Sequence, residues 1–199
     1  MTQSQQAQDS GSTAYAVSAR DVQAALIAAV YFFFVLGSYY VVRPVREQLG
    51  AAAGGSDVLP WLWTGTFIAT VVLTPFYGAI VARFPRRIFI PIAYAFFAIG
   101  MVAFSTIASS DHPSTSMAIA FYIWVSVFNL FVVAVFWSFM ADVFTDAQAR
   151  RLFGPIGIGG TVGAVAGPSA AKWLVGDIGV SGLLWLSSGA LLAALVCVL

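Results

Sequence analysis

The chain has 199 residues, of which 60% are apolar and only 9% are charged. A soluble globular domain has about 45 to 50% apolar and about 25% charged residues, and one of this size buries only roughly 70% of the surface that its unfolded chain exposes. The composition therefore excludes an ordinary soluble domain and predicts a membrane protein. Nine basic residues against eight acidic ones leave a net charge of +1, which offers no basic field for nucleic acid.

Six segments are long and apolar enough to cross a bilayer, which takes about 20 largely apolar residues per helix. Runs such as 28–36 are apolar on every side, unlike the alternating strands of a membrane barrel. We therefore predict an all-α bundle of six transmembrane helices over residues 22–199. The predicted spans are Val22 to Val42, Leu59 to Ala82, Ile88 to Ala108, Met117 to Val143, Phe153 to Val175 and Ser181 to Leu199.

The N-terminus is predicted to be cytoplasmic, because short cytoplasmic loops carry the excess of Lys and Arg. This orientation places six arginines inside and three basic residues outside. The inner set is Arg20, Arg83, Arg86, Arg87, Arg150 and Arg151, and the outer set is Arg43, Arg46 and Lys172. Residues 1–21, which are rich in Gln, Ser and Ala and lack the basic start of a signal peptide, are predicted to be a disordered cytoplasmic tail.

The sequence stops at Leu199 within an apolar run. We expect either that it is the N-terminal half of a longer protein or that a six-helix unit pairs with a second copy of itself. The sequence leaves both possibilities open.

Two arginines flank a proline at the outer end of the first span, in Arg43-Pro44-Val45-Arg46-Glu47. Proline removes an N–H and clashes with the preceding turn, so we predict that the helix kinks, breaks or restarts here. Arg43 and Arg46 would then form a multi-donor site for phosphate or carboxylate. Alternatively, both arginines extend to the outer headgroups and Glu47 pairs with Arg43 at i, i+4.

The loop after the second span contains Gly78 followed by Arg83, Arg86 and Arg87. So short a loop makes the second and third spans antiparallel neighbours. We expect Gly78 to permit a close approach of helices and the arginines to anchor the cytoplasmic face.

The fourth span carries a stripe at helical spacing, Ser126, Asn129, Val133, Trp137 and Met140, which should lie on one helical face. A polar stripe in a membrane helix faces protein or a cavity. Asn129 and Trp137 are therefore candidates for lining a cavity, and the alternative for Asn129 is an interhelical hydrogen bond. For Asp142, at the end of this span, we favour pairing with one of the loop arginines, Arg150 or Arg151.

The fifth span repeats glycine every four residues, at Gly159, Gly163 and Gly167, and Pro168 follows. Such a ridge lets helix backbones pack closely. We interpret it as a packing or rocking surface at the interface between two halves of a carrier.

No catalytic constellation is present in the sequence, so we expect neither an enzyme nor a cofactor or metal site. The only histidine, His112, lies in a short polar loop, and the only cysteine, Cys197, lies in an apolar run. GxSxG, HExxH and phosphate-cradling GxxxxGK motifs are missing.

Together these motifs resemble the N-terminal half of a major facilitator superfamily transporter. Gly78, Arg83, Arg86 and Arg87 are similar to that superfamily's G-x-x-x-D-R-x-G-R-R loop, although Ala82 and Pro85 depart from it. Gly154, Gly163, Gly167 and Pro168 resemble its antiporter motif. Within the superfamily the chain resembles the ATP:ADP antiporter branch, whose R-P-x-K/R-D/E element looks like Arg43, Pro44, Arg46 and Glu47.

The resemblance implies a secondary carrier of the inner membrane, working by alternating access between two six-helix bundles, for an anionic or phosphorylated solute such as ATP or ADP. The bundle would consist of two inverted three-helix repeats. A membrane assembly or scaffold protein that transports nothing, and a half-size carrier acting as a homodimer, are the alternatives. The candidate substrate-binding residues are Tyr39, Arg43, Arg46, Asn129 and Trp137. The candidate gating or packing residues are Gly78, Arg83, Arg87, Asp142, Arg151, Gly159, Gly163, Gly167 and Pro168.

Overall fold

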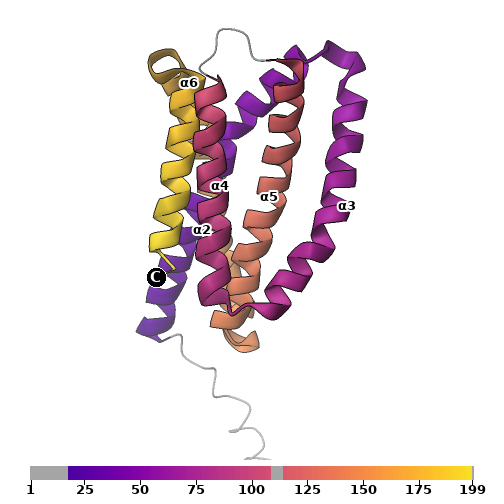
Figure 1. The fold of residues 1–199 in the computed structure, drawn as a ribbon. Coiled ribbons are helices and arrows are strands. Elements are labelled where there is room, and N and C mark those ends of the chain that lie inside the picture. The colour runs from indigo at the N-terminus through magenta and orange to yellow at the C-terminus, as the bar shows by residue number, and fades with distance from the viewer. Residues whose placement is uncertain (1–17, 109–113, 199) are drawn as a thin grey trace, which may run out of the picture.

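A computed structural model describes residues 18–108 and 114–198, and it is an all-α bundle (Figure 1). In these two ranges, five helices are long and apolar enough to cross a membrane by length and composition, which agrees with a multi-pass architecture. The elements in chain order are α2 (Ala19–Ala52), the 3-10 turn η1 (Gly55–Asp57), α3 (Leu59–Arg83), α4 (Arg86–Ala108), α5 (Thr115–Val143) and α6 (Asp146–Val196).

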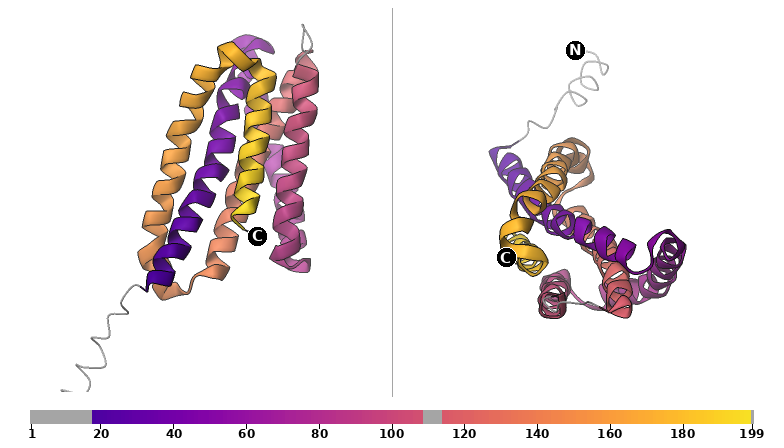
Figure 2. Two further views of the ribbon diagram at one scale, coloured as in Figure 1. Left: turned by 90° about the vertical axis from the view of Figure 1, so that its left-hand side faces the viewer. Right: turned by 90° about the horizontal axis from the view of Figure 1, so that it is seen from above.

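The prediction of six separate helices is not fully matched, because α6 continues for 51 residues through the last two predicted spans. A straight helix of that length would extend roughly 75 Å, against a hydrocarbon core of about 30 Å. Gly179 interrupts it with non-helical backbone angles, φ 65° and ψ −174°. The chain reverses there, so the second arm of α6 returns antiparallel to the first, on the other side of α2 (Figure 2). The loop expected between these spans is thus reduced to a tight turn.

The first helix also differs from its prediction. It continues through Pro44 to Ala52, so the predicted break or restart at the proline is wrong. It begins at Ala19, where the Ser18 side chain accepts a hydrogen bond from the Arg20 amide at 3.3 Å and the Asp21 carboxylate accepts one from the Ser18 amide at 3.0 Å. This capping box makes residues 19–21 helical rather than part of a disordered tail; residues 1–17 lie outside the described ranges.

The starts of α2 and α6 are tied together at the end of the bundle opposite the Gly179 turn. Thr145 caps α6, with its amide donating to Gln148 Oε1 at 3.0 Å. The Gln148 side-chain amide in turn donates to Asp21 Oδ1 at 2.7 Å. Two helix starts therefore share one polar network.

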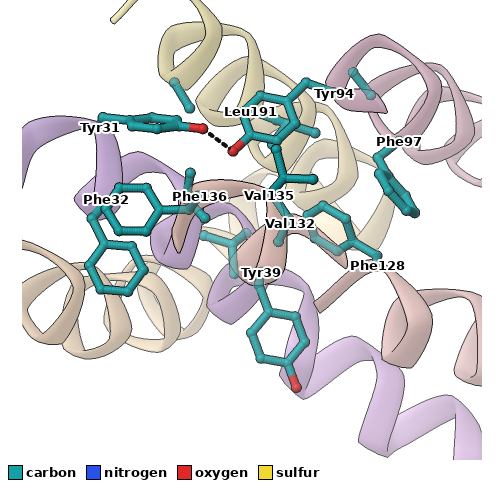
Figure 3. Close-up of a cluster of buried hydrophobic side chains, with 14 of the residues drawn as sticks. Tyr31, Phe32, Tyr39, Tyr94, Phe97, Phe128, Val132, Val135, Phe136 and Leu191 are labelled. Atoms are coloured by element: carbon teal, nitrogen blue, oxygen red, sulfur yellow. Dashed lines mark hydrogen bonds between the residues drawn. The ribbon is translucent and has the colours of Figure 1, made fainter. Parts of the chain in front are cut away.

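The core is centred on α2 and is rich in aromatic rings (Figure 3). Phe32 of α2 stacks on Phe136 of α5 with ring centroids 4.1 Å apart. Tyr31 and Tyr94 are buried and their hydroxyl groups hydrogen-bond to each other, which joins α2 to α4. Aromatic packing and a satisfied polar pair together fix the position of α2 within the bundle.

The glycine ridge of α6 packs directly against α2. A Cβ at Gly167 would lie 2.8 Å from the Cβ of Tyr40 and 3.0 Å from the carbonyl oxygen of Gly37, and one at Gly159 or Gly163 would overlap the backbone of α2. Close packing was expected of the ridge, but its placement between two halves of a carrier is wrong, because α2 of the same bundle already covers it. It is equally unavailable to a second copy of the chain. Pro168, half-buried beside Gly167, does not interrupt α6.

α3 lies at the edge of the bundle (Figure 1), where Tyr77 packs against Phe131 of α5, and Leu62 is its one buried residue where burial is described. Gly78 lies on its exposed surface, and a Cβ added there would meet no atom within 4 Å. The prediction that Gly78 lets helices approach closely is therefore wrong for the described residues.

Candidate substrate cavity

A cavity of about 440 Å³ lies between α3, α5 and the C-terminal part of α2. On α3 its lining residues recur at helical spacing and so occupy one face. Taken over all three helices, the lining residues combine one cation with hydroxyl, amide and aromatic groups. The lining residues are Arg46, Trp63, Thr66, Phe67, Thr70, Tyr122, Ser126, Asn129 and Leu130.

Arg46 is held in this wall by three contacts. Its Nη1 donates to Ser126 Oγ at 3.2 Å, and its guanidinium carbon lies 4.9 Å from the centroid of the Tyr122 ring. Its Nη2 pairs with the carboxylate of Glu47. Only 14% of the Arg46 side chain is exposed, against 49% for Glu47. The Arg46 guanidinium is therefore fixed in the cavity wall, and the carboxylate of Glu47 that neutralises it lies on the more exposed side of the pair.

Two buried polar atoms of the lining residues have no hydrogen-bond partner, namely Arg46 Nε and Thr66 Oγ1. Leaving such a group unpaired costs roughly 1 to 3 kcal/mol, and more when it is charged. Native structures keep few such groups, and each calls for an explanation, such as a bound water or ion that completes the pairing. Each of the two atoms could pair with an oxygen acceptor, as in a carboxylate or phosphate, once small side-chain shifts open it to the cavity.

The structure brings together some of the predicted substrate-binding residues and separates others. Arg46 and Asn129 both line the cavity. Arg43 is exposed and lies 5.5 Å from the centroid of the Tyr40 ring, so the two arginines do not converge on one site. Tyr39 is buried in the core near Phe128 (Figure 3).

The predicted stripe on α5 divides along its length. Ser126 and Asn129 face the cavity, whereas Trp137 lies farther along the helix, with its ring centroid 5.4 Å from Phe32 of α2 and 5.3 Å from Phe153 of α6. Trp137 therefore packs between helices and does not line this cavity.

At the opposite end of the bundle, Asp142 pairs with Arg86. We expected Asp142 to neutralise Arg150 or Arg151 in the following loop; the structure adds a partner from the preceding basic loop, which the sequence did not suggest. Arg86 also donates to the Ser138 carbonyl oxygen, which ties the start of α4 to the end of α5. Arg83, Arg87 and Arg151 are exposed at the same end.

Several residues of these sites were not predicted from the sequence. Thr66 and Thr70 share a face at i, i+4 in a largely apolar helix, a signal that could have placed α3 in the cavity wall. Arg86 is half-buried and contacts α5, whereas Arg83 and Arg87 are exposed, a difference that sequence does not reveal. In the described residues, no group of three or more His, Cys, Asp or Glu could hold a metal ion, and His112 lies outside them.

The family model of the Major Facilitator Superfamily matches residues 22–199. The chain belongs to this superfamily. Membership in the Major Facilitator Superfamily makes the protein a multi-pass membrane transporter of the facilitator type, in keeping with its long apolar helices. No curated protein and no solved structure gives a significant match.

Proposed function

We propose that the protein is a secondary carrier for an anionic solute, which it binds at Arg46 in the cavity between α2, α3 and α5. The observation that carries this proposal is the mostly buried guanidinium of Arg46 with an unpartnered Nε, in a cavity that Thr66, with its unpartnered hydroxyl, also lines. Because the Arg46 side chain is mostly shielded from water, its charge strongly favours an anionic partner. Transport would proceed by alternating access between this bundle and a second one, without a bound cofactor.

The proposal extends to phosphorylated solutes such as ATP and ADP, and to their exchange. Its support is the R-P-x-R-E element that ends at Glu47 and the antiporter-like glycines of α6. We further propose that the two arms of α6 act as separate spans, which would give six spans arranged as two inverted three-helix repeats.

The proposed orientation places the N-terminus in the cytoplasm and the protein in the inner membrane. The helix starts and loops bearing Arg20, Arg83, Arg86, Arg87, Arg150 and Arg151 gather at one end of the bundle (Figure 1). Arg43, Arg46 and Lys172 are the basic residues of the outer side. Basic residues favour the cytoplasmic side. Because Arg46 lies toward the other end of the bundle, the cavity would open to the outer side of the membrane.

The test is uptake of radiolabelled ATP, ADP and inorganic phosphate by proteoliposomes that contain the full-length protein. We expect Arg46→Gln to abolish uptake of the transported solute at unchanged membrane abundance. Arg43→Gln is the matched control, because it removes the same charge from an exposed position, and it should retain most activity. Uptake that is unchanged in Arg46→Gln would reject the assignment of the site. A wild-type protein that takes up no anion would favour the scaffold alternative.

A further inference from the structure

The planar guanidinium of Arg46 presents its N–H donors along two edges, each of which can hold two oxygen atoms at once. Nη1 is used by Ser126 and Nη2 by Glu47, while Nε has no partner. Nε and Nη2 point along one edge. That edge is therefore only half occupied by the carboxylate of Glu47.

The two members of this ion pair differ in how firmly they are held. Arg46 is fixed by Ser126 and by the ring of Tyr122. About half of the Glu47 side chain is exposed, and no other hydrogen bond of its carboxylate is seen among the described residues. Water screens the exposed carboxylate and competes with it, which weakens its hold on the guanidinium. Glu47 can thus leave at small cost when another anion takes its place, whereas Arg46 stays in place.

We propose that Glu47 is an internal competitor for the anion site, and this inference rests on the function proposed above. The carboxylate or phosphate of the solute takes the Nε–Nη2 edge of Arg46, accepts a hydrogen bond from Thr66 Oγ1, and displaces Glu47 outward. One anion replaces another, so the buried cation is neutralised both before and after binding. An empty carrier therefore avoids the cost of an unpaired buried charge.

The exchange also sets selectivity. A neutral solute lacks the charge needed to compete with a carboxylate that is tethered to the next residue of the chain. Anions with two oxygen atoms in one plane fit the edge of the guanidinium, whereas halides cannot span it. The site should accordingly reject neutral solutes and simple halides.

The test is a calorimetric titration of the full-length protein in an uncharged, lipid-free detergent, with ATP, inorganic phosphate and acetate as probes. We expect Glu47→Gln to bind the tightest of these probes roughly fivefold more tightly than wild type, because the competitor is gone. Thr66→Val should bind it roughly tenfold more weakly, since it loses one hydrogen bond to a charged group. Asp177→Asn removes the same charge from an exposed position near the Gly179 turn and should leave the affinity unchanged.

Unchanged or weaker binding by Glu47→Gln would overturn the proposal, because Glu47 would then serve only to orient Arg46. No binding of any probe to wild type or Glu47→Gln would overturn it as well. A titration with phosphatidylglycerol separates the two sources of phosphate: binding of this lipid alone would overturn a solute site. If Glu47→Gln does not fold, Thr66→Val decides, and wild-type affinity in that variant would reject the edge-on site.

These results are distinct from those that test transport. Tight binding of a probe without uptake would reject the carrier and leave the competition intact. Uptake that depends on Arg46 but is unaffected by Glu47→Gln, in both affinity and rate, would reject the competition alone.

Discussion

Gly163 of α6 lies so close to Phe33 of α2 that a Cβ added to the glycine would overlap the Phe33 carbonyl oxygen. Backbone cannot move aside as the end of a side chain can. We expect Gly163→Ala to destabilise the protein by roughly 1 to 3 kcal/mol through overpacking. A thermal melt in detergent measures this effect. Gly157→Ala is the control, because a Cβ there meets nothing within 4 Å; equal melting temperatures for the two variants would contradict the close packing.

The buried hydroxyl groups of Tyr31 and Tyr94 satisfy each other. Tyr94→Phe should cost roughly 1 to 3 kcal/mol, because it leaves the Tyr31 hydroxyl buried without a partner. The double variant with Tyr31→Phe should regain most of this loss, since both polar groups are then removed. A double-mutant cycle on the unfolding midpoint measures the coupling. Additive losses would show that the hydrogen bond carries no coupling energy.

Arg86 joins α4 to α5 through Asp142 and the Ser138 carbonyl. We expect Arg86→Gln to lower the free energy of unfolding by about 1 kcal/mol, a modest loss because both side chains of the ion pair are partly exposed. Arg87→Gln, at an exposed position one residue along, should have little effect. Chemical denaturation in mixed micelles can compare the two. Equal losses would mean that the net charge of the loop matters and the ion pair does not.

Gly179 adopts backbone angles that are open almost only to glycine, with φ 65° and ψ −174°. Gly179→Ala should therefore cost roughly 1 to 3 kcal/mol. Gly176→Ala, three residues earlier on the same arm and with open space around its Cβ position, should be neutral or slightly stabilising. Thermal melts of both variants test the turn, and a neutral Gly179→Ala would show that the reversal does not depend on glycine.

The sequence predicts the helical segments well, because apolar length is a local property of the chain. Leu59–Arg83 and Thr115–Val143 begin and end within two residues of their predictions. Pro44 shows where local reasoning fails. Proline disfavours a helix interior, yet Val42 and Val45, two positions before Pro44 and one after it, are buried in the core, and their packing offsets the lost hydrogen bond.

The candidate cavity was only partly predictable, because it depends on how the side chains of three helices converge. Arg46 and Asn129 could be singled out as polar groups in apolar surroundings. The ion-pair partners of Arg46 and Asp142 could not be predicted in this way. Arg46 pairs with its chain neighbour Glu47, and Asp142 pairs with Arg86, which lies 56 positions away in the sequence. Spacing along one helix gives the face of a residue, but only packing between helices gives its partner.

The wall of the cavity is unevenly anchored. Arg46, Tyr122 and Ser126 are carried by α2 and α5, whose packing forms the core, whereas Thr66 and Thr70 are carried by α3, which contributes Leu62 to the buried residues. Elements with few buried contacts move at low energetic cost. Thr66 would therefore approach or retreat from Arg46 with each tilt of α3, while the cation stays still. The affinity for the solute would then depend on the tilt of α3. It would be high when α3 lies close to the Arg46 guanidinium and low when α3 tilts away.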